Sequence, residues 1–144
     1  MGSRKRLRAE ATKEARKYVA SAQLRNYPTS PRKMRLVADM VRGLDVQKAL
    51  FLLKHSPKHA TLPLEKLVLS AINNWEQKNE DASVDDAALY ISEIQVDSAR
   101  MLKRIQPAPQ GRAHRVRKRS NHVTVVVSPR IAEPLTGETN EINE

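Results

Sequence analysis

The segment between residues 96 and 123 constrains the fold of this chain more than any other. Residues 98–119 carry eight basic side chains and no acidic one. At their centre lie Pro107, Pro109 and Gly111, residue types that mark a reversal of the chain. Residues 123–127 are all β-branched, which favours a strand. The pattern therefore predicts one long β-hairpin at about residues 97–121.

Such a hairpin would protrude from the rest of the protein. Arms of about thirteen residues, at about 3.3 Å per residue, would extend on the order of 40 Å. An isolated two-stranded ribbon is marginally stable in water, so we expect this one to become ordered against a polyanion. The alternative is a floppy basic loop, which would also become structured only in RNA or DNA. The basic residues concerned are Arg100, Lys103, Arg104, Arg112, Arg115, Arg117, Lys118 and Arg119.

The remaining chain predicts an α+β fold, with three helices packed on a small antiparallel sheet. The first helix starts after Ser30, with Pro31 in its first turn, and ends at Gly43. The second spans residues 46–54. The third has a continuous apolar stripe and starts near residue 56 or residue 62. Strands are expected at residues 19–27, 88–97 and 121–128.

The first of these helices has two contrasting faces. Its apolar side contains Met34, Val37 and Val41. The opposite side contains Arg32, Arg35 and Arg42, together with Asp39. We therefore expect one face to join the core and the other to present guanidinium groups.

Charge also divides the chain into three parts. Residues 1–21 form a basic extension, and residues 22–130 form the middle part of the chain. Residues 131–144 hold four Glu and no basic residue, so we predict an acidic, disordered tail. The formal net charge of +10 indicates a polyanionic partner.

Several functional classes are excluded by what the sequence lacks. There is no cysteine, hence no disulfide scaffold and no thiol nucleophile. His55 and His59 have helical metal-ligand spacing, but Pro57 lies between them and no third ligand is near. No glycine-rich phosphate loop is present, and the apolar runs are too short for a bilayer. We expect a cytosolic protein that is not an enzyme and has no metal, cofactor, membrane partner or homo-oligomer.

Short stretches along the chain carry a resemblance to a known family. They are SPRKMRLVAD at 30–39, VRG at 41–43, LSAINN at 69–74, VD at 96–97, LKRI at 102–105, GRA at 111–113, KR at 118–119 and HVTVVV at 122–127. Their order and spacing resemble those of the bacterial form of the large-subunit ribosomal protein L-twenty-two family. The resemblance covers roughly residues 22–130 and implies that they form a single RNA-binding domain with the extended hairpin at about 97–121.

The resemblance implies a structural, non-catalytic component of the large ribosomal subunit in the cytoplasm. It implies binding to large-subunit rRNA, a role in assembly, and a globular domain next to the exit of the peptide tunnel. The hairpin would thread through the rRNA and its tip would line the tunnel wall. There the tip would meet the nascent peptide and a second tunnel protein, L-four, close to where macrolides bind.

The resemblance also implies roles for individual residues. The expected RNA contacts are Arg25, Arg32, Lys33, Arg35, Arg100, Lys103, Arg104, Arg112, Arg115, Arg117, Lys118, Arg119 and His122. The expected tunnel tip is Gln106, Pro107, Ala108, Pro109, Gln110, Gly111 and Arg112. Many bacterial members carry Arg and Lys near the tip, whereas this chain is uncharged from Gln106 to Gly111. The alternative function is a free-standing nucleic-acid-binding regulator or architectural protein.

Overall fold

The computed structural model of the chain describes residues 3–79, 83–84 and 87–130. The elements in chain order are α1 (Ser3–Tyr18), β1 (Ala20–Tyr27), α2 (Pro31–Val41), α3 (Val46–His55), α4 (Thr61–Glu76), β2 (Leu89–Ser98), β3 (Leu102–Pro107), β4 (Ala113–Lys118) and β5 (Asn121–Pro129). The three predicted helices and the three predicted core strands are all present, which confirms the α+β class. Helix α4 begins close to the later of its two expected starts.

Strand β5 is the central strand of a three-stranded antiparallel sheet with the order β1-β5-β2. The register of β2 with β5 pairs Ile91 with Val127 and Ile94 with Val125. Between these pairs the register shifts by one residue, so β2 contains a bulge at Ser92. Because of the bulge, both isoleucines are buried although they lie three residues apart.

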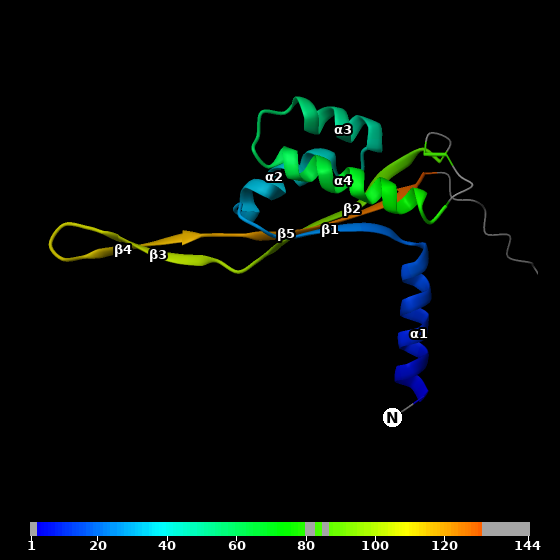
Figure 1. Cartoon of the computed structure of the whole chain (residues 1–144), viewed down its shortest axis with the longest axis horizontal. Coiled ribbons are helices and arrows are strands. Elements are labelled where there is room, and N and C mark those ends of the chain that lie inside the picture. Colours follow the sequence, from blue (N-terminus) through cyan, green and yellow to red (C-terminus); the bar gives the residue numbers. More distant parts are fainter. Residues whose placement is uncertain (1–2, 80–82, 85–86, 131–144) are drawn as a thin grey trace, which may run out of the picture.

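The core lies between this sheet and helices α2, α3 and α4, which cover one face of it (Figure 1). Met34, Val37 and Val41 of α2 are fully buried, as the wheel pattern predicts. They belong to the same buried cluster as the apolar stripe of α4 and alternate residues of β5, such as Val123 and Val125. Each large apolar side chain buried in this way contributes about 1.5–3 kcal/mol. The other sheet face carries mainly polar side chains.

Strands β3 and β4 form the predicted hairpin as a separate two-stranded sheet. Figure 1 shows this arm continuing from β2 and β5 and projecting well beyond the helical domain. Ser98 pairs with Asn121 at the end of the core sheet, and Leu102 pairs with Lys118 at the start of the arm. Three residues separate these pairs on one side and two on the other. The ladder of the arm is therefore offset by one residue from that of the core.

Helix α1 is a difference from the prediction, because the sequence predicts no helix in the basic extension at residues 1–21. Residues 3–18 contain no Gly or Pro and are rich in Ala, Arg, Lys and Glu, which favour helices. Arg6 Nε also pairs with Glu10 Oε1 at 2.9 Å, one turn away. All side chains of residues 3–14 are exposed. Local preferences rather than core packing therefore form α1.

The acidic tail predicted at residues 131–144 lies outside the described residues. Among the residues that are described, none of the helices combines the length and the apolarity that crossing a membrane requires.

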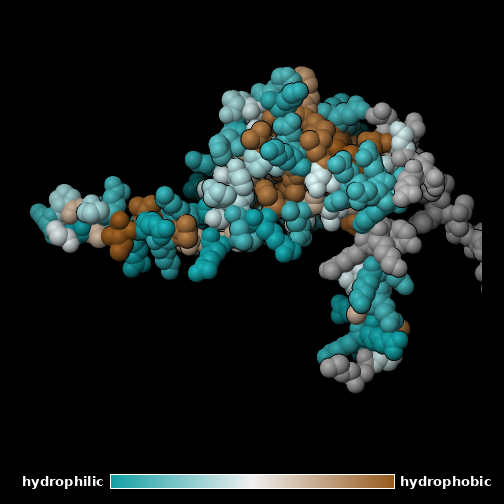
Figure 2. Space-filling view, viewed as in Figure 1, coloured by the Kyte–Doolittle hydropathy of each residue, from teal (hydrophilic) through white to brown (hydrophobic). Residues whose placement is uncertain are grey.

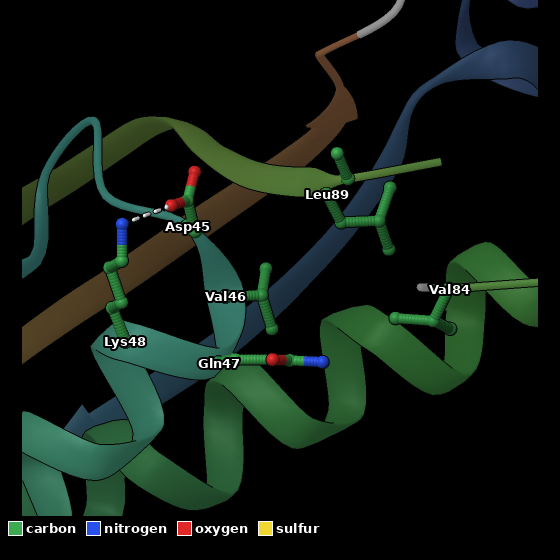
Figure 3. Close-up of a pocket in the computed structure, with 7 residues that line it drawn as sticks. Asp45, Val46, Gln47, Lys48, Val84 and Leu89 are labelled. Atoms are coloured by element: carbon green, nitrogen blue, oxygen red, sulfur yellow. Dashed lines mark ion pairs between the residues drawn. The ribbon is translucent and has the colours of Figure 1, made fainter. Parts of the chain in front are cut away.

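A cleft of about 440 Å³ lies beside the start of α3. It is lined by Asp45, Val46, Gln47, Lys48, Val84, Ala88 and Leu89 (Figure 3). Asp45 accepts from Lys48 Nζ at 2.9 Å and from Arg130 Nη1 at 2.8 Å. The hydrogen bond from Lys48, together with attraction by Arg130, lowers the pKa of Asp45 against an opposing effect of desolvation. These contacts connect the start of α3 to the residue that follows β5.

Asp45→Asn should lower the free energy of unfolding at roughly pH 7 and should have little effect at roughly pH 2. The pKa of Asp45 is lower in the folded chain than its ordinary value of 3.8. Its ion pairs therefore stabilise the fold above that ordinary value, and the stabilisation is lost as the pH falls through the folded-state pKa. Urea unfolding at both pH values measures the change. Glu76→Gln is the exposed control, and equal losses at both pH values would contradict the prediction.

Candidate nucleic-acid interface

The hairpin carries its cations on both faces of a ribbon that no other element covers. Side chains alternate along each strand, and directly paired residues share a face. One face contains Lys103, Ile105, Arg115 and Arg117. The other contains Leu102, Arg104, Val116 and Lys118. Figure 2 shows the arm as mainly hydrophilic with a few apolar side chains between.

The positive charges of the hairpin are not neutralised by ion pairs with the residues that the structure describes. Lys103 lies directly opposite Arg117 in the ladder, and like charges in that arrangement destabilise a strand pair. Arg104 Nη1 donates only to a backbone oxygen, that of Lys103, at 3.0 Å. None of the eight basic residues at 98–119 forms an ion pair with any residue that the structure describes. The arm is thus suited to a polyanion that surrounds it.

The tip of the hairpin is a five-residue loop at residues 108–112. It is closed by the Ala108 N–H, which donates to the Arg112 carbonyl at 2.8 Å. Gly111 has the positive φ expected of it, +70°, and Gln110 has a φ of +63° as well. A Cβ placed on Gly111 would meet no atom within 4 Å. Backbone conformation rather than packing therefore sets the shape of the tip.

The first turn of α2 presents the second predicted group of cations. Arg32 and Lys33 are both exposed there. The loop before this turn is fixed to the base of the hairpin, because Asn121 Nδ2 donates to the Thr29 carbonyl at 2.6 Å. The structure therefore holds Arg32 and Lys33 in a defined place relative to the start of β5.

Arg35 and Arg42 fasten α2 to the outer edge of β2. Arg35 donates from Nε and Nη2 to the Val96 carbonyl, at 3.2 and 3.0 Å. Arg42 Nη2 donates to the Ile94 carbonyl at 3.1 Å, while its Nη1 pairs with Asp39 at 2.7 Å. These bonds cover an edge strand that would otherwise expose free carbonyls. Arg35 thus has a structural role that uses its Nε and Nη2 atoms. Its predicted contact with RNA would use Nη1.

Arg25 and His122 come together at the base of the hairpin. They line a shallow depression of about 380 Å³ on the open face of the sheet, together with Gln23, Asp97 and Thr124. A register shift between Leu24 and Tyr27 makes a bulge in β1, in which Asn26 has a φ of +55°. The Asn26 N–H then donates to His122 Nδ1 at 3.1 Å. Because Nδ1 of His122 accepts this hydrogen bond, the proton of the neutral imidazole is on Nε2, which can donate to a ligand.

Asn121 is a residue of this site that the sequence analysis does not identify. It is fully buried, and its Oδ1 has no hydrogen-bond partner among the described residues. Its position in the sequence could have identified it, because every second residue of β5 from 121 to 127 lies on the buried face of the strand. A polar residue in an inward position, next to a run of valines, indicates a specific buried hydrogen bond.

The predicted site residues therefore form two groups. The hairpin cations and the tip lie along the arm, and Arg25, Arg32, Lys33, Arg35 and His122 lie on the domain from which the arm projects. No cluster of three or more potential metal ligands occurs among the described residues. The arrangement can bind phosphate groups and bases at two places, and it contains no constellation for bond-breaking chemistry.

Comparison with known proteins gives consistent matches. Residues 22–128 match the family described as "Ribosomal protein L22p/L17e", a range that nearly coincides with the predicted domain. The chain is 65% identical over 127 residues to the "Large ribosomal subunit protein uL22" of Christiangramia forsetii, covering 88% of this chain and 94% of the relative.

Two further relatives have the same description. The protein of Flavobacterium johnsoniae is 63% identical over 127 residues, and that of Bacteroides fragilis is 57% identical over the same length. In both comparisons the alignment covers 88% of this chain and 93% of the relative.

Proposed function

This chain belongs to the ribosomal protein L22p/L17e family, and from that membership we propose that it binds large-subunit rRNA, aids assembly and lines the nascent-peptide tunnel with its hairpin tip. As a family member it is a structural, non-enzymatic component of the large ribosomal subunit in the cytoplasm. The geometry of the hairpin and of α2 supports the finer roles.

The observation that carries the proposal is a long ribbon whose cations form no ion pair with any described residue. Two of its apolar side chains are exposed too, Leu102 at 51% and Ile105 at 75% of their full accessibility. rRNA supplies both missing partners, since phosphates neutralise Lys and Arg, and base or sugar surfaces cover apolar groups. Arginine suits this role because its planar fork binds phosphate with two donors and stacks on bases.

The second group of contacts would fix the orientation of the domain on the RNA. Arg32 and Lys33 extend from α2, whereas Arg25 and His122 lie on the open face of the sheet. The hydrogen bond from Asn121 to Thr29 holds α2 to the base of the arm. A single rigid body would therefore bind separate RNA segments in a fixed relation to each other.

The tip would contribute shape rather than charge to the tunnel wall. Residues 106–111 have no ionisable side chain, and Pro107 and Pro109 restrict the backbone. We propose that the tip neighbours protein L-four and meets the nascent peptide transiently.

Sedimentation distinguishes this function from a free-standing nucleic-acid-binding regulator. The chain is expected to sediment with large subunits when a cell lysate is separated on a sucrose gradient. It should remain with them at salt concentrations that remove loosely bound proteins. Recovery of the chain only at the top of the gradient would favour the regulator and contradict the proposal.

Deleting residues 108–110 should change the affinity of large subunits for macrolides without preventing assembly. Pro107 pairs with Ala113, so the deletion leaves Gly111 and Arg112 as a two-residue loop. Glycine in its first position suits a type II′ turn, and the charged arms remain. The measurements are occupancy of the shortened protein in purified subunits and macrolide binding to those subunits.

Substitution of residues 108–110 by three alanines keeps the loop length and provides the control for this deletion. Normal occupancy with unchanged macrolide affinity would show that the tip does not lie beside the drug. Failure of the shortened protein to incorporate would show that the tip is needed for assembly.

A further inference from the structure

Helix α1 is a strongly charged element to which the proposed function gives no role. Residues 3–18 contain seven basic residues and two glutamates. The family model begins only at residue 22, so the description of the family does not include α1. The charge of α1 therefore needs an explanation of its own.

The basic side chains of residues 3–14 are exposed and largely unpaired among the described residues. Arg6 pairs with Glu10, and both side chains are well exposed to solvent. Arg4, Lys5, Arg8 and Lys13 form no ion pair with any residue that the structure describes. Figures 1 and 2 show α1 projecting from the domain as a mainly hydrophilic helix.

The point at which α1 leaves the domain is fixed. Asn74 Nδ2 donates to the Ser21 carbonyl at 3.0 Å, and Lys78 Nζ donates to the Val19 carbonyl at 2.7 Å. These bonds hold the residues just after α1 against the C-terminal end of α4. Figure 1 shows α1 and the hairpin extending from different sides of the domain and in different directions. One body thus bears two separate cationic extensions.

We propose that α1 is a second RNA-binding element, which contacts the phosphate backbone of a helical rRNA segment separate from those around the hairpin. This inference rests on the proposed function. Residues 3–17 contain no aromatic side chain, so this segment offers none of the stacking surfaces typical of proteins that bind single strands. Helical RNA is recognised mainly through its backbone and shape, for which exposed Lys and Arg are suited.

Other kinds of binding partner fit the surface of α1 less well. Leu7 is the only large apolar residue among residues 3–14. A helix that binds in a protein groove or lies on a membrane needs a continuous apolar face, which this segment does not have. If both α1 and the hairpin bind rRNA, they act as linked contacts. Once one of them is bound, the other binds at a raised effective concentration.

A charge-neutralised variant tests the contribution of α1 to RNA binding. K5Q/R8Q/K13Q in the full chain should weaken binding to purified large-subunit rRNA about tenfold at about 0.15 M salt. The log–log dependence of affinity on salt should become less steep by about one to two. K54Q/K58Q/K66Q removes the same charge from exposed positions on α3, α4 and the segment between them. Equal effects of the two variants would overturn the inference.

Photo-crosslinking in assembled large subunits separates this inference from the proposed function. A crosslinker at Ala9 reports on α1 and one at Ile105 reports on the hairpin, since both residues are exposed. Both should crosslink to rRNA, at nucleotides in different segments. If Ala9 crosslinked only to protein or lipid, or to the segment that Ile105 reaches, the inference would fail while the proposed function stood. If Ile105 gave no crosslink to RNA, the proposed function itself would be contradicted.

Discussion

Replacing Lys103, Arg115 and Arg117 together by Gln is expected to weaken binding to large-subunit rRNA about a hundredfold at about 0.15 M salt. The three cations share one face of the hairpin and have no ion-pair partner among the described residues. If each neutralises one phosphate, the log–log slope of affinity against salt should become less steep by about two to three. Gln keeps most of the length and polarity of these side chains, so the change reports mainly on charge.

Affinity should be measured by filter binding or fluorescence titration over a range of salt concentrations. The triple variant K54Q/K58Q/K66Q is again the matched control, because it removes the same charge from exposed positions away from the hairpin. An unchanged salt slope in the hairpin variant would mean that this face does not contact phosphate. Neutralising Arg104 and Lys118 would then test the opposite face of the ribbon.

Asn121→Asp is expected to lower the free energy of unfolding by about 3–5 kcal/mol. The side chain of Asn121 is fully buried and donates to the Thr29 carbonyl. An ionised aspartate has no donor for that carbonyl and places an unpaired negative charge in the core. Asn121→Ala, which removes the donor without adding charge, should cost about 1–3 kcal/mol.

Urea unfolding of the full chain near neutral pH measures both values. Asn73→Asp on the exposed side of α4 introduces the same chemical change where solvent reaches it, and it should have little effect. Stability close to that of the wild type in both Asn121 variants would show that the hydrogen bond to Thr29 does not hold α2 to the hairpin base.

Apolar periodicity was enough to predict most of the fold. Helix α4 has an uninterrupted stripe, and β5 is a run of β-branched residues, so packing and local preference agree there. The hairpin followed from turn-forming residues between two strands. Even the irregular spacing of Ile91 and Ile94 can be understood once the bulge at Ser92 is seen, although the sequence alone does not indicate which residue bulges.

The missed features depend on information that a charge or hydropathy pattern does not contain. Arg32 and Arg35 both lie on the predicted basic face, yet Arg32 faces solvent and Arg35 bonds to the edge of β2. Only the packing angle of α2 decides between these outcomes. Gln110 adopts a positive φ that the tip imposes on it. Residues 3–14 of helix α1 are all exposed, so no stripe of core residues marks this helix in the sequence.

The alternation of side chains along β3 and β4 limits how the hairpin can change its length during evolution. Adding one residue to each strand would turn every side chain beyond the insertion to the opposite face of the ribbon. Lys103, Arg115 and Arg117 would then exchange sides with Arg104 and Lys118. Two added residues in each strand would restore the original faces. Insertions or deletions in the paired arm should therefore be tolerated most readily in steps of about four residues in total, equally divided between β3 and β4.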